Sequence, residues 1–272
     1  MTAASGATAP GSKWRVDSQS IAAADRDAFR SADQLLQLPM EPVTRDRRSA
    51  VSRLSLQSVY YVKTFVGHGS RLKYWLGISR YQREVRNLQY FSRLGLDTPL
   101  LVASGHQSRL GLLQQAVLVT REVENAIDLE QIIRDAALYR DGVAGARVVL
   151  AKLARAARRL HNDGFYHKDL KPRNILLRYT DTEPELFFFD CPSGHHPPRL
   201  LLRRGIVRDL AHLEDGLRGH VRRVDLLYMY KQYRGCQKLS DEDKALAREA
   251  LSYYRTRRMT RKRRRREKQK QA

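Results

Sequence analysis

A carboxylate, a lysine and an amide lie close together in FYHKDLKPRNILL, residues 165–177, between two apolar segments. They are Asp169, Lys171 and Asn174, and a second carboxylate, Asp190, ends the apolar run LFFFD farther along the chain. Carboxylate and amide oxygens are hard ligands that suit Mg²⁺, which usually takes one or two protein carboxylates and completes its shell with water and phosphate oxygens. A lysine beside them adds a cation for a phosphate. The set predicts phosphate chemistry rather than acyl transfer.

The segments around these residues predict how they are positioned. Residues 145–164 show apolar side chains at helical spacing and end in Asn-Asp-Gly, which predicts a long helix leading into the polar stretch. The runs at 175–179 and 185–190 predict two strands of a small hairpin. We therefore expect residues 168–174 to form a loop before the first strand, with Asp190 at the end of the second.

The order of these residues is typical of one class of phosphate-handling protein. An Asp and an Asn separated by four residues, preceded by a histidine and followed by another Asp about 20 residues later, mark the catalytic and metal-binding loops of protein kinases. Such a site also needs a strand lysine and a helical glutamate. Lys63 stands in the apolar run VYYVKTF, where a bare ammonium would be costly to bury, and Glu84 follows 21 residues later. His167 is expected to be a structural residue.

The first half of the chain predicts mainly strands. Residues 49–56 and 58–65 predict two neighbouring strands with a tight turn at Gln57 and Ser58, and residues 116–123 predict a buried strand. Between them, residues 79–95 show helical spacing, with Gly95 as the C-cap. Glu84 falls within that helix. From about Leu200 onward the pattern is helical.

The charge is high and uneven. The chain has 51 Lys and Arg against 29 Asp and Glu, a net charge of +22, and residues 255–270 hold eleven basic residues and one glutamate. This tail predicts a mobile arm or a frayed helix that meets an anionic surface. An acidic membrane is the first expectation and nucleic acid the second, with a solvated tail that has no dedicated partner as the alternative.

Other features of the composition concern location. No run approaches the roughly 20 apolar residues that a membrane-spanning helix needs, and we find no secretory signal at the N-terminus. The two cysteines, Cys191 and Cys236, agree with a reducing compartment. We expect a cytoplasmic protein.

The chain resembles the protein-kinase-like superfamily, and in particular the lipopolysaccharide core kinases that phosphorylate Kdo or heptose. The segments that carry the resemblance are YYVKTF, REVRNLQYFSRLGLDTP, LHNDGFYHKDLKPRNILL, FFFD and RDLAHL, and together they span roughly residues 29–235. The resemblance implies an α+β, two-lobed kinase-like fold. The corresponding parts are a small β-rich nucleotide-binding N-lobe (28–122) and a mostly helical catalytic and metal-binding C-lobe (123–254). The small, polar residues of 1–27 predict a disordered segment before them, and the basic tail (255–272) follows.

The resemblance also implies a reaction and a role for each residue. Phosphate would pass from ATP to a sugar hydroxyl of a lipid-linked acceptor, at the cytoplasmic face of the inner membrane. Asp169 would orient or deprotonate the hydroxyl, and Lys171 would stabilise charge on the transferred group. Asn174 and Asp190 would hold Mg²⁺. Lys63 would bind the ATP phosphates and Glu84 would anchor Lys63.

Three departures from the kinase pattern shape this interpretation. No glycine occurs between Gly11 and Gly67, so the glycine-rich loop over the phosphates is missing, and backbone amides of residues 46–53 are the expected substitute, with Arg47 or Arg48. Asp190 is followed by Cys-Pro rather than Phe-Gly. No Ala-Pro-Glu segment is present, which favours a small or lipid-borne acceptor. A serine/threonine protein kinase is the alternative enzyme, and a catalytically silent module that binds membrane or nucleic acid through its tail is the alternative class.

Overall fold

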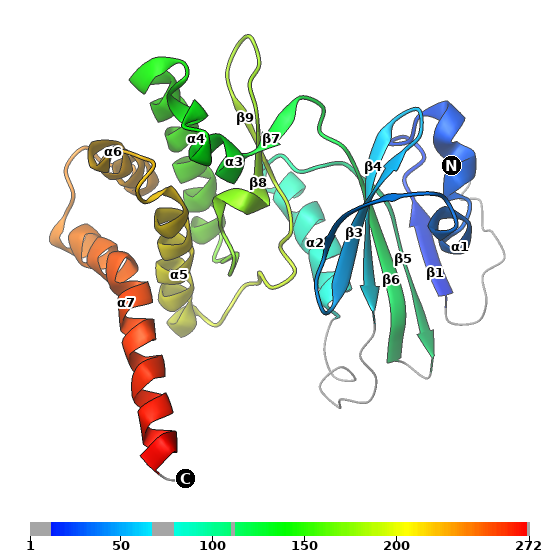
Figure 1. Cartoon of the computed structure of the whole chain (residues 1–272). Helices are drawn as coiled ribbons and strands as arrows, with labels where there is room; N and C mark the ends of the chain where they lie inside the picture. Colours follow the sequence, from blue (N-terminus) through cyan, green and yellow to red (C-terminus); the bar gives the residue numbers. More distant parts are fainter. Residues whose placement is uncertain (1–11, 67–78, 110–111, 271–272) are drawn as a thin grey trace. The chain divides into compact units, whose positions relative to one another are not determined.

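A computed structural model describes residues 12–66, 79–109 and 112–270 of the chain (Figure 1). The chain divides into two compact units. The first comprises residues 1–92 and 98–124, and the second comprises residues 93–97 and 125–272. The predicted boundary between residues 122 and 123 lies close to this division. Each unit is described by itself below.

The first unit is built on a six-stranded antiparallel sheet with the strand order β1-β5-β6-β4-β3-β2. Its strands are β1 (Ser12–Val16), β2 (Glu41–Arg45), β3 (Ser49–Ser55), β4 (Val59–Val66), β5 (Leu101–Arg109) and β6 (Leu112–Arg121). Its helices are the 3-10 helix η1 (Ala23–Phe29), α1 (Ala32–Leu36) and α2 (Arg80–Arg93). The predicted hairpin is confirmed as β3 and β4, and the predicted helix as α2, with Gly95 at a φ of 72° just beyond it.

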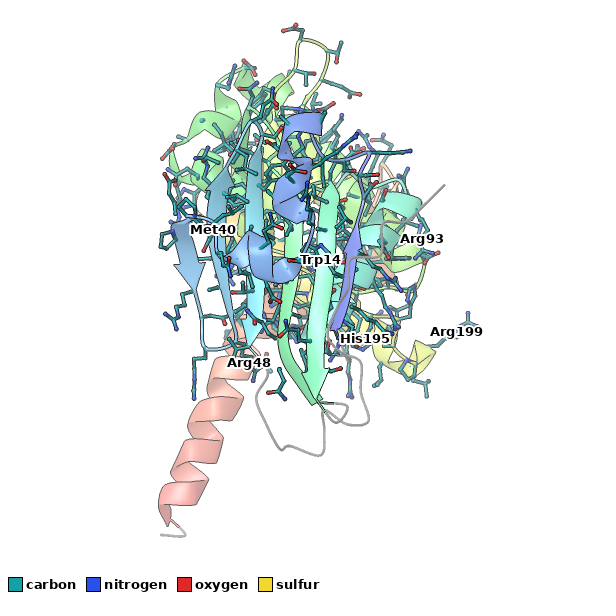
Figure 2. All side chains as sticks on the ribbon, turned by 90° about the vertical axis from the view of Figure 1, so that its right-hand side faces the viewer. Trp14, Met40, Arg48, Arg93, His195 and Arg199 are labelled. Carbon is teal, nitrogen blue, oxygen red and sulfur yellow. The ribbon has the colours of Figure 1, made fainter. Side chains whose placement is uncertain are left out.

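The two faces of this sheet bury different side chains because strand residues alternate in direction. On one face, Tyr60 and Val62 of β4 pack with Phe29 and Leu35 of the short helices, which lie across the sheet in Figure 2. The other face carries α2. There Phe65 packs with other apolar residues, among them Tyr81, Leu88, Ala116 and Leu118. Lys63 pairs with Leu118 across the ladder and therefore points to the α2 face.

The prediction that residues 1–27 are disordered is wrong for the part that the structure describes. Strand β1 pairs with β5, and the indole nitrogen of Trp14 donates a hydrogen bond of 2.8 Å to the carbonyl of Phe29. The buried carboxylate of Asp25 accepts hydrogen bonds from the amides of Gln57 and Ser58 in the β3–β4 turn. These contacts with other segments order residues 12–27 even though the segment itself is polar. Residues 1–11 lie outside the described residues.

The second unit is mostly helical, with one small antiparallel sheet ordered β7-β8-β9. Its strands are β7 (Ala126–Asp128), β8 (Ile175–Arg178) and β9 (Glu185–Phe188). Its helices are α3 (Leu129–Arg134), η3 (Ala137–Tyr139), α4 (Gly142–Asn162), η4 (Pro172–Asn174), α5 (Arg199–Leu217), α6 (Arg223–Arg234) and α7 (Asp241–Lys270). Helix α4 packs against α6, and α5 against α7. The predicted α+β class, with a β-rich first part and a helical second part, is confirmed.

The basic tail does not begin as a separate arm at residue 255. The backbone of residues 255–270 continues α7, which starts at Asp241 after the cap of Ser240 (Figure 1). In the part of the chain that the structure describes, no helix has both the length and the apolar character needed to cross a bilayer.

Candidate functional site

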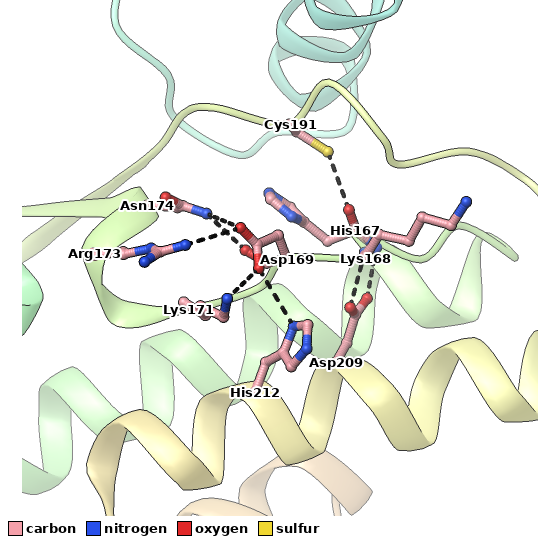
Figure 3. A network of polar contacts seen from close by, with 9 residues as sticks. All are labelled: His167, Lys168, Asp169, Lys171, Arg173, Asn174, Cys191, Asp209 and His212. Carbon is pink, nitrogen blue, oxygen red and sulfur yellow. Dashed lines mark hydrogen bonds and ion pairs between the residues drawn. The ribbon is translucent and has the colours of Figure 1, made fainter. Parts of the chain in front are cut away.

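The loop that carries Asp169 is held by hydrogen bonds to a buried carboxylate of α5. Asp209 is fully buried, and its oxygens accept hydrogen bonds from the backbone amides of His167 (2.5 Å) and Lys168 (2.9 Å) (Figure 3). Lys168 has a φ of 72°, in the left-handed region that non-glycine residues seldom adopt. The two hydrogen bonds that these amides donate to a charged acceptor offset the cost of this conformation. The loop is therefore held in one shape just before Asp169.

The carboxylate of Asp169 lies among three cationic or amide donors of the same loop. Lys171 Nζ is 2.6 Å from Oδ1, an Arg173 nitrogen is 3.5 Å from Oδ2, and Asn174 Nδ2 is 2.8 Å from the Asp169 carbonyl and 3.3 Å from Oδ2 (Figure 3). Burial would raise the pKa of Asp169, but the hydrogen bond and charge of Lys171, with the charge of Arg173, hold it below its usual range. The side chain remains 33% exposed. Asp169 is an ionised, accessible carboxylate.

The β8–β9 hairpin places Asn174 opposite Phe189, the residue before Asp190. The amide of Phe189 donates a 3.1 Å hydrogen bond to the carbonyl of Asn174, so the residue before Asp190 is tied directly to Asn174. Asp190 adopts a left-handed φ of 52°. Because Asn174 Nδ2 makes the two bonds to Asp169, its Oδ1 is the atom that could bind a cation. Among the described residues no three His, Cys, Asp or Glu side chains gather around a metal site. One carboxylate and one amide oxygen still fit Mg²⁺, which keeps water and phosphate ligands.

His167 and Cys191 are both buried beneath the loop that carries Asp169. The His167 ring is buried, and burial lowers its pKa against the opposing charges of Asp209, Asp169 and Asp190. Cys191 Sγ is 3.6 Å from the His167 carbonyl and is also buried (Figure 3). Both positions agree with the prediction that His167 is structural.

Lys63 and Glu84 form an ion pair in the first unit. Lys63 Nζ of β4 lies 2.6 Å from Glu84 Oε1 of α2, and Nζ is also 5.4 Å from the centre of the Phe65 ring. The Glu84 side chain is 3% exposed and that of Lys63 is 13% exposed. The sequence argument that a lysine in so apolar a strand needs a partner therefore identified the right pair.

The turn between β2 and β3 differs from the expected substitute for a glycine-rich loop. Asp46 Oδ1 accepts hydrogen bonds from the amides of Arg48 (2.6 Å) and Ser49 (2.7 Å). These amides are thus satisfied within the turn, and the prediction that they approach a phosphate is wrong for both. The side chains of Arg47 and Arg48 are exposed, and Figure 2 shows Arg48 at the end of the sheet. These two side chains are therefore the groups of this turn that are available to contact a phosphate.

Sequence reasoning missed two residues that contact the loop. Asp209 holds the backbone before Asp169, and His212 Nδ1 lies 3.8 Å from Asp169 Oδ1. Both lie in RDLAHL, three residues apart and thus on one face of α5. This spacing, together with the presence of a carboxylate in an apolar helix, could have indicated that Asp209 and His212 contact the loop.

Comparisons with known proteins agree with this geometry. Residues 39–233 match the model of the Lipopolysaccharide kinase (Kdo/WaaP) family, which is more than half of the chain. Among solved structures, the chain is similar to "WaaP in complex with acyl carrier protein", with a TM-score of 0.67 and 18% sequence identity. That match covers 89% of this chain and 99% of the other. It confirms the kinase-like fold.

Proposed function

This chain belongs to the lipopolysaccharide kinase (Kdo/WaaP) family, and on that premise we propose that it transfers phosphate from ATP to a hydroxyl of a Kdo or heptose residue in a lipopolysaccharide core. The observation that carries the proposal is the loop at Asp169. It presents an ionised carboxylate, a lysine and an amide on a backbone that Asp209 holds in one shape.

Each residue of the site has a part in this reaction. Asp169 accepts a hydrogen bond from the acceptor hydroxyl and orients its oxygen toward the γ-phosphorus. It takes the proton as the new P–O bond forms and the bond from the γ-phosphorus to the bridging oxygen breaks, releasing ADP. Lys171 is bonded to Asp169 in the resting protein. It moves to the transferred phosphoryl group, where it stabilises negative charge, as Asp169 turns to the hydroxyl.

In this proposal, Lys63 and Glu84 act on the nucleotide phosphates, and Asn174 and Asp190 act through the metal ion. Lys63 binds the α- and β-phosphates of ATP, and Glu84 keeps the ammonium group in place, which its buried position allows. Asn174 and Asp190 supply the oxygens for Mg²⁺, which when bound neutralises phosphate charge. The exposed Arg47 and Arg48 are candidates for further phosphate contacts, since the amides of that turn are used by Asp46.

The basic residues of 255–270 suit an anionic membrane surface better than a dedicated protein contact. Eleven basic residues against one glutamate would add about 1 kcal/mol of attraction for each group that reaches an acidic lipid surface. We propose that the protein acts at the cytoplasmic face of the inner membrane as a peripheral protein. Nucleic acid is the second candidate partner. The similar WaaP structure contains acyl carrier protein, so a protein of that kind is also worth testing as a partner.

The test is the mass of the product. Purified protein, ATP and Mg²⁺ are incubated with lipopolysaccharide whose core phosphates have been removed enzymatically, and the core oligosaccharide is then analysed by mass spectrometry. The proposal predicts one added phosphate on Kdo or heptose. Phosphorylation of a protein substrate with none on the core would support the serine/threonine kinase alternative. No transfer to either, with salt-sensitive binding to anionic vesicles, would support the silent module.

A further inference from the structure

The imidazole of His212 faces the catalytic carboxylate from α5. Its Nδ1 is 3.8 Å from Asp169 Oδ1, beyond hydrogen-bonding distance, and the side chain is only 5% exposed (Figure 3). Across the described ranges, Nδ1 has no hydrogen-bond partner. A buried polar nitrogen without a partner costs stability. Its position next to Asp169 makes it a candidate hydrogen-bond donor to that carboxylate during the reaction.

Two tyrosines of α7 cover this histidine. The Tyr254 ring lies nearly parallel to the imidazole, at 27° with the ring centres 6.0 Å apart. Tyr253 meets His212 edge-on, at 81° and 6.5 Å, and meets Tyr254 at 85° and 5.3 Å. Helix α7 therefore packs an aromatic cluster against the residue that faces Asp169.

Tyr254 is linked to Asp169 through His212, since its ring stacks on the imidazole whose Nδ1 is 3.8 Å from Asp169 Oδ1. Burial raises the pKa of the Tyr254 hydroxyl, and the charges of Asp215 and Asp169 raise it further, with a contribution from Tyr253. The Tyr254 side chain is only half-buried, so part of the ring remains accessible. An accessible aromatic ring that stacks on the neighbour of the hydroxyl-accepting carboxylate is suited to the apolar face of a sugar ring, since ligand sites pair apolar walls with a few polar groups.

We propose that Tyr254 forms a wall of the acceptor-sugar site and that His212 positions Asp169 toward that wall, so that α7 is part of the active site. This inference rests on the proposed function and adds to it where the sugar binds. When Lys171 leaves Asp169 for the phosphoryl group, the Nδ1–H of His212 takes over as donor to Oδ1. Asp169 then keeps a defined orientation while its other oxygen receives the hydroxyl. His212 is a positioning residue, and Tyr254 contacts the substrate.

Sugar binding is tested without nucleotide, by calorimetric titration of the full chain with dephosphorylated core oligosaccharide. Tyr254→Ala is expected to raise Kd about three- to tenfold, the range for loss of one aromatic contact. The matched control is Tyr228→Ala, which removes a half-buried tyrosine from the neighbouring α6. The proposal is overturned if the wild-type protein does not bind the oligosaccharide, or if Tyr254→Ala binds it as tightly as the control does.

The role of His212 is tested by steady-state kinetics on the same acceptor. His212→Ala is expected to lower kcat severalfold with little change in the KM for ATP. His212→Asn should restore most of the loss, because its amide nitrogen can take the place of Nδ1. Equal rates for all three proteins, or no recovery in a folded His212→Asn variant, would refute the positioning role. A wild-type protein that binds the sugar but transfers no phosphate would count against the proposed function instead.

Discussion

Two lysine–carboxylate pairs, one in each unit, have the same length but different surroundings. Lys63 Nζ is 2.6 Å from Glu84 Oε1, and Lys171 Nζ is 2.6 Å from Asp169 Oδ1. The side chains of the first pair are 13% and 3% exposed, whereas those of the second are 30% and 33% exposed. The first pair joins a strand to a helix, and the second lies within one loop.

This difference separates a contact that must persist from one that can exchange. Breaking a buried pair leaves a charge without compensation, so Glu84 and Lys63 are expected to stay together. A partly exposed pair contributes less to stability, because water and other ions can replace either partner at smaller cost. Lys171 and Asp169 can therefore part when a phosphate and a hydroxyl arrive. In the proposed reaction, the Lys63–Glu84 pair is a fixed anchor, and the Lys171–Asp169 pair is a resting state that opens when substrates bind.

The largest effect is expected from Asp169→Asn. Loss of the carboxylate removes the proton acceptor, so kcat should fall about a thousandfold, while the thermal midpoint stays near that of the wild type because the pair is partly exposed. Initial rates with ATP and dephosphorylated core, with a melting curve, check this. Asp181→Asn, at an exposed position of the β8–β9 turn, is the matched control and should keep full activity. A large drop in stability for Asp169→Asn would instead show that the Lys171–Asp169 pair is a structural contact like the Lys63–Glu84 pair.

Lys171→Met should have the next largest effect. The variant loses the cation that meets the transferred phosphoryl group, so kcat is expected to fall about a hundredfold. It also loses the hydrogen bond and charge that lower the pKa of Asp169, so that pKa should rise. Because Asp169 must be ionised to accept a proton, the acid limb of the pH–rate profile should move to higher pH. An unmoved acid limb would argue against Asp169 as the group that titrates.

Glu84→Gln should affect stability and nucleotide binding together. It removes the negative charge that lies 2.6 Å from the Lys63 ammonium, which is expected to cost about 2 kcal/mol in the free energy of unfolding. The KM for ATP should rise, while kcat at saturating ATP changes less than in the Asp169 variant. Urea unfolding and ATP titration measure the two effects. Exchange of Glu249, a surface partner of Arg203, for Gln is the control and should change neither.

The smallest effect concerns His212 and pH. Burial, with the charges of Lys171 and Arg208 and against those of Asp209 and Asp169, lowers the pKa of His212 to about 4. The unfolded chain therefore binds a proton first as the pH falls below the ordinary value of 6.5, and the free energy of unfolding should decline from there toward pH 4. His167 acts in the same direction. His212→Asn should reduce the decline between pH 7 and pH 5 in urea titrations, and an identical decline would contradict this.

Sequence predicted the parts of the molecule that local pattern determines. Helix α2, the β3–β4 hairpin and the hairpin after the loop follow from side-chain periodicity, and Lys63 with Glu84 follows from the cost of a buried charge. Contacts between distant segments could not be predicted in this way. Strand β1 is ordered by β5, about ninety residues later, and Asp209 reaches amides 42 residues before it. Neither segment carries a local signal of its partner.

The measurement that most directly tests the central claim is phosphate transfer to dephosphorylated core lipopolysaccharide by the wild type, Asp169→Asn and Glu84→Gln, assayed side by side at saturating ATP. We predict product from the wild type, product from Glu84→Gln despite its lower stability, and almost none from Asp169→Asn despite a wild-type melting curve. A folded Asp169→Asn variant that transfers phosphate at the wild-type rate would contradict the claim that this partly exposed pair is the resting state of the reaction.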